Sequence, residues 1–90
     1  MVNILGIKSN EVYTVDIHNY KIEEAKKYLE RLIVSINPEI KEIFVIHGYH
    51  RGDALQNMVR NDLKSKRISK RILSLNPGVT SLIIEPKEMQ

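Results

Sequence analysis

Residues 42–48 read Glu-Ile-Phe-Val-Ile-His-Gly, a nearly all-apolar run that ends at a histidine and a glycine. A short apolar run without alternation is typical of a buried strand in a parallel sheet. The run therefore predicts a strand over residues 42–46, followed by a polar loop from His47 to Gly52. A parallel strand must be reached through a crossover, and the preceding residues supply a helix for it.

Those preceding residues complete a strand–helix–strand unit. Residues 12–18 alternate in polarity, which predicts a strand. Residues 22–36 place apolar side chains at spacings of three and four, which predicts a helix that ends at Asn37-Pro38. The two strands are then expected to be parallel and joined by a right-handed crossover.

The second half of the chain predicts one more helix and a hairpin. Asp53 is a favourable helix N-cap, and Gln56 three residues later completes a capping-box pattern. Residues 68–75 and 79–85 read as the two strands of a hairpin, with a tight turn over residues 76–78. The sequence thus predicts an α/β two-layer sandwich of βαβαββ order, with a mixed four-stranded sheet and two helices.

The 90 residues allow one domain, which we expect to span residues 1–90 with its core within residues 12–85. Residues 2–7 are a candidate edge strand that would pair with residues 11–16. The chain has no cysteine, which excludes disulfides, thiolate metal sites and a cysteine nucleophile. It has neither the ~18-residue apolar run of a membrane span nor a signal-peptide pattern, so we expect a cytoplasmic protein with no membrane partner.

All three histidines fall in the loops that follow the first two predicted strands. Asp16 and His18 end the first strand, and His47 and His50 lie at and just beyond the end of the second. Because parallel strands end at the same edge of a sheet, these side chains are expected to meet where open α/β sheets bind ligands. Carboxylate and imidazole also suit zinc or manganese, so a divalent metal is chemically compatible, although no compact metal-binding motif is present.

The loop from Gly48 to Gly52 is a candidate anion site. It leads into a helix whose free N–H groups suit a phosphate oxygen, and Arg51 offers a bidentate contact. Tyr20 and Tyr49 flank the two loops and are able to stack on bases. Such loops are often only tight turns, and loop tyrosines often only pack across a sheet.

The net charge of +3 is unevenly distributed. Residues 60–71 hold six basic side chains against Asp62 alone, a local charge of +5 that is able to attract a polyanion. Arg60, Lys64 and Arg67 would line one solvent face if the second helix continued to residue 67. The alternative is a solvated helix end whose cations suit the negative pole of the helix dipole.

These segments together resemble the small MutS-related (Smr) domain family over residues 12–85. The family's Leu-Asp-Leu-His motif, helix start, His-Gly-x-Gly-x-Gly loop and last strand are similar to Val15-Asp16-Ile17-His18, Ile22-Glu23-Glu24-Ala25, Val45-Ile46-His47-Gly48 and Gly78-Val79-Thr80. Five features depart from the family pattern. Lys21 stands where the family often has a threonine helix cap, and Asp53 lengthens the glycine loop by one residue. Asn19 replaces a usual glycine, His50 replaces the middle glycine of the loop, and the loop before the last strand is shortened to Asn76-Pro77-Gly78.

The resemblance implies a fold like the C-terminal domain of bacterial translation initiation factor three, and it implies binding of DNA or RNA. It also implies endonuclease or nicking activity, in which His47 and His18 would transfer protons and Asp16 would orient an imidazole or hold a metal. The nucleic-acid contacts would come from Gly48, Tyr49, His50, Arg51, Gly52, Arg60, Lys64 and Arg67.

A module that binds nucleic acid or a protein without cleaving it is the alternative function. The altered glycine loop favours this binding module, whereas the presence of Asp16, His18 and His47 together favours the enzyme. The open edge expected of so small a domain argues against a hydrolase of small phosphoesters, because small ligands prefer enclosed pockets.

Overall fold

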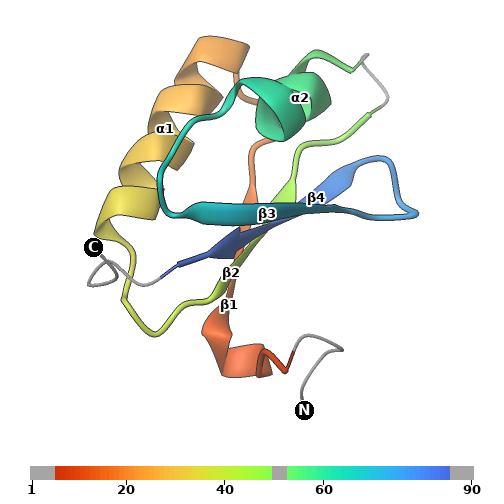
Figure 1. The fold of residues 1–90 in the computed structure, drawn as a ribbon. Coiled ribbons are helices and arrows are strands. Elements are labelled where there is room, and N and C mark those ends of the chain that lie inside the picture. Colours follow the sequence, from red (N-terminus) through yellow and green to blue (C-terminus); the bar gives the residue numbers. More distant parts are fainter. Residues whose placement is uncertain (1–5, 50–52, 86–90) are drawn as a thin grey trace.

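The structure, a computed structural model, describes residues 6–49 and 53–85 and shows a sheet with two helices beside it (Figure 1). The strands are β1 (Val12–Asp16), β2 (Glu42–Ile46), β3 (Ile68–Leu73) and β4 (Val79–Ile84). The helices are α1 (Ile22–Ser35) and α2 (Ala54–Asn57), which continues into a π-helical turn, η2 (Met58–Asp62). Within the described ranges no helix is long and apolar enough to cross a membrane.

The four strands form one mixed sheet in the order β1-β2-β4-β3. β1 and β2 are parallel, and β4 is antiparallel to both β2 and β3, which confirms the predicted fold class and its C-terminal hairpin. In the register, Asp16 lies opposite Ile46, and Ile46 lies opposite Val79. The ends of β1 and β2 are therefore level with the start of β4. We call this end the carboxyl edge of the sheet.

The two helices contact one another and lie on the same side of the sheet, where they enclose a single core (Figure 1). Ala25, Leu29 and Ile33 form the buried stripe of α1, as their spacing predicts. The sheet, the residue after β1 and the second helix supply the rest of the core: Val15, Ile17, Ile43, Val45, Leu82, Ile84, Met58, Val59 and Leu63. Burying each large side chain is worth roughly 1.5–3 kcal/mol, so this core fixes the strands that carry the polar edge.

β1 ends at Asp16, two residues before its predicted end. The cause is local, because the Asp16 carboxylate accepts the backbone N–H of His18 at 3.0 Å. The N–H of Tyr20 also donates to the carbonyl of Ile17 at 2.9 Å, which closes a turn. Side-chain bonds of this kind compete with the strand ladder and end it.

The hairpin strands are also shorter than predicted, since β3 ends at Leu73 and β4 at Ile84. The Ser74 hydroxyl accepts the backbone N–H of Asn76 at 3.0 Å. The Asn76 side chain in turn accepts the N–H of Gly78 at 2.8 Å. Polar side chains thus take over backbone donors in the connection between the two strands.

The predicted capping box of the second helix does not form. Asp53 has φ −111° and ψ 13°, outside the extended region usual for an N-cap, and its side chain makes no capping bond. Gln56 donates instead to the carbonyl of Pro77 at 2.7 Å and ties the helix to the β3–β4 connection.

The second helix ends at Asp62, so the condition for a continuous basic face, a helix that reaches residue 67, is not met. The N–H of Leu63 donates to the carbonyl of Met58 at 2.8 Å, which closes a π-helical turn. Leu63 itself has an extended ψ of 127° and is fully buried. The burial of Leu63 in the core therefore ends the helix, and the chain turns toward β3 at this residue.

The candidate edge strand over residues 2–7 lies mostly outside the described residues. Residues Ser9–Glu11 form a 3-10 helix, η1, closed by the N–H of Glu11 on the carbonyl of Lys8 at 2.9 Å. The tight hairpin turn expected at Ser9-Asn10 is therefore replaced by a helical turn before β1.

Candidate functional site

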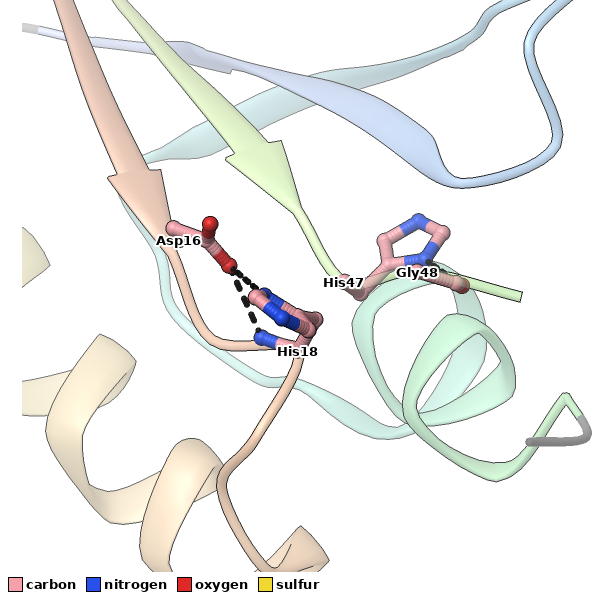
Figure 2. Close-up of polar contacts among 4 residues, drawn as sticks. All are labelled: Asp16, His18, His47 and Gly48. Atoms are coloured by element: carbon pink, nitrogen blue, oxygen red, sulfur yellow. Dashed lines mark hydrogen bonds and ion pairs between the residues drawn. The ribbon is translucent and has the colours of Figure 1, made fainter. Parts of the chain in front are cut away.

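Asp16 and His18 form a polar pair where β1 reaches the carboxyl edge (Figure 2). One carboxylate oxygen of Asp16 accepts two hydrogen bonds from His18, one from Nδ1 of the ring and one from the backbone N–H. Both side chains remain about half exposed. The turn that ends β1 thus holds an imidazole against a carboxylate at a place that solvent reaches.

The electrostatics of this pair keep Asp16 ionised. The hydrogen bond from the His18 side chain lowers the pKa of Asp16 below its usual 3.8, and the backbone N–H of His18 adds to this. Because the carboxylate can only accept, His18 must carry its proton on Nδ1. In the neutral imidazole, Nε2 is then the atom with a free lone pair, which is the arrangement that a general base requires.

The β2 end lies directly beside this pair. The backbone N–H groups of His47 and Gly48 both donate to the carbonyl of Gly78, at 2.9 and 3.0 Å. Gly48 has φ +77°, and a Cβ built there would lie 3.1 Å from Cβ of His18. A glycine is thus required twice, once by its left-handed backbone and once by the closeness of His18. The connection after β1, the connection after β2 and the connection between β3 and β4 therefore meet at Gly48.

The ring of His47, by contrast, is buried in a hydrogen-bonded network on the helix side of β4. Its exposed fraction is only 2%. Its Nδ1 lies 2.9 Å from the carbonyl oxygen of Gly48, and its Nε2 lies 2.9 Å from the hydroxyl of Thr80. Arg60 Nε donates to the same hydroxyl at 2.7 Å.

This network requires a single protonation state of His47. A carbonyl oxygen only accepts, so Nδ1 carries the proton and Nε2 accepts the hydrogen of Thr80. Burial lowers the pKa of His47 below its usual 6.5; the bond to Gly48 opposes this shift, and the charge of Arg60 adds to it. His47 is therefore neutral near pH 7, with both ring nitrogens engaged.

Asp16, His18 and His47 all lie at the predicted edge, but they do not form one cluster of side chains. Figure 2 shows the His47 ring pointing away from the Asp16–His18 pair. What lies beside His18 is the backbone of Gly48. The structure thus brings together Asp16, His18 and Gly48, whereas the His47 ring is directed away from the pair toward Thr80.

The arginines of the basic segment bind main-chain carbonyl groups. Arg60 donates through Nη2 to the carbonyl of Val79 at 3.1 Å, in addition to its bond to Thr80. Arg71 donates to the carbonyl groups of Arg60 and Leu63 at the end of the second helix. Cations at this position complement the negative end of a helix, which was the alternative interpretation of the segment.

Arg67 and Lys64 do not continue a basic face from the glycine loop. Arg67 donates to the carbonyl groups of Ile33, in α1, and Glu85, beyond β4. Because Ile68 lies opposite Ile84, this arginine sits by the end of the sheet remote from Asp16. Lys64 is exposed but follows the end of η2. The predicted phosphate track therefore lacks its structural basis.

The remaining predicted contacts are in the loop after β2. Tyr49 is 50% exposed at the carboxyl edge. His50, Arg51 and Gly52 lie outside the described residues. Among the residues that are described, no three His, Cys, Asp or Glu side chains gather as metal ligands. The proposed metal set of Asp16, His18, His47 and His50 is thus not assembled by its described members.

Sequence reasoning missed Thr80, which joins His47 to Arg60. It also missed Gly78, whose carbonyl holds the loop after β2. The only signal in the sequence is a pair of hydroxyl residues, Thr80 and Ser81, near the start of a strand whose other residues are apolar. A buried hydroxyl in such a strand needs a partner, but its identity depends on residues 20 and 33 positions away.

Comparisons with known proteins agree with the fold. No curated protein matches the chain. Among solved structures, the Smr domain of Thermus thermophilus MutS2 is similar, with a TM-score of 0.73 and 20% sequence identity. The match covers 82% of this chain and 99% of that one, and it supports the fold. The family model of the Smr domain matches residues 15–80, most of the chain and all of the residues discussed above as the site. This chain therefore belongs to the Smr domain family.

Proposed function

We propose that the carboxyl edge binds nucleic acid, with the Asp16–His18 pair at the scissile phosphodiester. The observation that carries this proposal is the exposed imidazole held by an ionised carboxylate beside the backbone of Gly48. Glycine lets a polymer backbone approach closely, and the half-exposed pair is open to a long ligand. Membership of the Smr domain family supports the same ligand class.

The chemistry of this pair fits cleavage of RNA. Nε2 of His18 takes the proton of a ribose 2′-hydroxyl, and the 2′-oxygen attacks the adjacent phosphorus. The bond from phosphorus to the 5′-oxygen breaks, and that oxygen takes a proton from water. The hydroxide that remains takes the proton held on Nε2 of His18, which restores the neutral imidazole. The products are a 2′,3′-cyclic phosphate and a 5′-hydroxyl end. Asp16 orients the ring and stabilises the imidazolium that forms.

His47 acts in this proposal as a positioning residue. Its two nitrogens are engaged with Gly48 and Thr80, so it holds the shape of the loop rather than exchanging protons with substrate. This differs from the role that the family resemblance implied for it. Arg51 remains the expected phosphate contact, whereas Nε and Nη1 of Arg67 already donate to main-chain carbonyl groups, and its Nη2 is buried without a hydrogen-bond partner.

A second candidate function is binding without cleavage. The observation that favours it is the buried state of His47, because among the described histidines it leaves only the imidazole of His18 available where a two-proton mechanism uses two groups. In this case the edge still holds nucleic acid, and Asp16 and His18 act as polar contacts. Both functions predict binding at the same residues.

The test separates binding from cleavage. Labelled single- and double-stranded RNA and DNA are incubated with the protein, with and without EDTA, and bound and cut fractions are scored separately. We expect RNA cleavage to survive EDTA, because the 2′-hydroxyl supplies the nucleophile. DNA lacks that hydroxyl, so any nicking needs a metal-activated water and is expected to stop in EDTA.

Three variants make the test specific. His18→Ala should abolish RNA cleavage, and Asp16→Asn should slow it by about 10²–10⁴-fold, the usual contribution of an acid–base group. Asp62→Asn, an exposed carboxylate at the end of η2, is the matched control and should cut normally. Binding of RNA and DNA without cutting would leave the binding function alone, and binding of neither would contradict both.

A further inference from the structure

Three of the four tyrosines gather between β1 and α1, a group that we call the tyrosine cluster. Tyr13 lies in β1, Tyr20 in the connection after β1, and Tyr28 in α1. The ring centres of Tyr20 and Tyr28 are 5.7 Å apart at an interplanar angle of 52°. Besides burial, the neighbouring Tyr13 side chain contributes to the raised pKa of Tyr28. The arrangement of the Tyr20 and Tyr28 rings is close to the preferred tilted geometry of aromatic pairs.

The tyrosine cluster packs against the hydrophobic core on one side and is exposed to solvent on the other. Tyr28 packs against the hydrophobic core, and its burial raises the pKa of its phenol. Tyr20 and Tyr13 remain 41% and 39% exposed, and Ile22 beside them is 41% exposed. An aromatic ring that the core supports from behind and that water reaches from the front is suited to stack against a flat partner.

The cluster is continuous with the Asp16–His18 pair. The turn that begins at Ile17 places Tyr20 two residues after His18, so their Cα atoms are at most about 7 Å apart. Lys21, which follows Tyr20, is exposed and offers a cation. An imidazole, an ammonium group and an aromatic ring within one short connection match the phosphate and the base of a nucleotide.

We infer that Tyr20, supported by Tyr28, stacks on an unpaired base of a strand whose phosphodiester lies at His18; this rests on the proposed function. In a duplex both faces of each base are covered by neighbouring bases, so a ring is able to take a base only where the strand is single or splayed. The substrate class at this edge is therefore single-stranded nucleic acid or an unpaired loop.

The experiment measures binding by fluorescence anisotropy in EDTA with three labelled 12-mer probes. They are single-stranded oligothymidylate, the same sugar–phosphate backbone without bases, and a DNA duplex. The probe without bases keeps the charge of the strand and removes only stacking. Using DNA in EDTA prevents cleavage from affecting the affinities.

Tyr20→Ala should weaken binding of oligothymidylate by about 5- to 100-fold, the range for loss of one stacked base. It should leave the other two probes within twofold. Tyr20→Phe keeps the ring and should bind all three like the wild type. Val34→Ala removes a side chain that is 55% exposed near the other end of α1, and serves as the control that changes nothing.

Two results would overturn the inference, and they are distinguishable. If the wild type binds and Tyr20→Ala either changes no probe or weakens all three alike, Tyr20 is no base platform, while the proposed binding function stands. An exposed cluster of that kind would then be a surface for a partner protein. If the wild type binds none of the probes and no RNA, the proposed function falls together with this inference.

Discussion

The hydroxyl of Thr80 lies 2.9 Å from Nε2 of His47 and fixes that ring on the buried side of the loop. Arg60 holds the same hydroxyl from the second helix at 2.7 Å. Two histidines at one edge thus receive different environments. His18 is half exposed against an ionised carboxylate, and His47 is buried and neutral. In the proposed function, His18 transfers the proton and His47 supports the loop after β2.

Thr80→Val should destabilise the protein by about 1–3 kcal/mol. The substitution keeps the shape but leaves Nε2 of His47 and Nε of Arg60 without their shared partner, and unpaired buried polar groups carry a cost of this size. Urea unfolding followed by circular dichroism measures it. Thr80→Ser keeps the hydroxyl and is the control. Equal losses of unfolding free energy in the two variants would contradict the role of the His47–Thr80–Arg60 hydrogen bonds.

The free energy of unfolding should fall as the pH drops below about 6.5. Because the folded state depresses the pKa of His47, this residue binds a proton more readily when unfolded. Its contribution is therefore complete above its usual pKa of 6.5 and is lost as the pH falls toward the lower folded value.

Denaturation curves from pH 8 to pH 5 test this dependence. His47→Gln should flatten the curve over this range. The same slope in His47→Gln and the wild type would assign the effect to other groups.

Gly48→Ala should lower the free energy of unfolding more than Gly6→Ala does. Both glycines have nearly the same left-handed backbone, with φ of +77° and +78°, and each substitution costs about 1–2 kcal/mol for that reason. A Cβ at Gly6 meets nothing within 4 Å, whereas one at Gly48 lies 3.1 Å from Cβ of His18. The difference between the two variants in unfolding free energy therefore reports the His18 contact, and no difference would contradict it.

Arg67→Ala should lower stability by about 1–3 kcal/mol, whereas Lys64→Ala should change it by less than 0.5 kcal/mol. Arg67 donates to the carbonyl groups of Ile33 and Glu85, and its loss leaves these acceptors unpaired. Lys64 is an exposed side chain, and surface substitutions of this kind have small effects. Thermal melts of both variants at one salt concentration measure the difference, and equal melting temperatures would count against the structural role of Arg67.

Periodicity was sufficient to predict α1 and β2 nearly to the residue. The stripe of Ala25, Leu29 and Ile33 leaves one way to bury the helix, and an all-apolar strand fits only the middle of a sheet. The sequence also predicted that Asp16 and His18 lie together at the end of the first strand, but their hydrogen bond comes from the turn that ends β1 at Asp16. These features depend on contacts close in the sequence or on the hydrophobic pattern.

Tertiary contacts determined what the sequence could not predict. The second helix contains favourable residues beyond Asp62, but the burial of Leu63 ends it. The direction of the His47 ring depends on Thr80, 33 residues away. The positive charge of residues 60–71 predicted a surface that attracts polyanions. The arginines of this segment instead donate to main-chain carbonyl groups, and no sequence pattern reveals these contacts.

The central claim is that nucleic acid binds at the carboxyl edge beside Asp16 and His18. Backbone amide shifts recorded by NMR during titration with a single-stranded oligonucleotide in EDTA test it most directly. The account predicts the largest changes at residues 16–21, 47–49 and 76–79, with little change at residues 64–70. The largest changes at Lys64, Lys66 and Lys70, with none around His18, would contradict it.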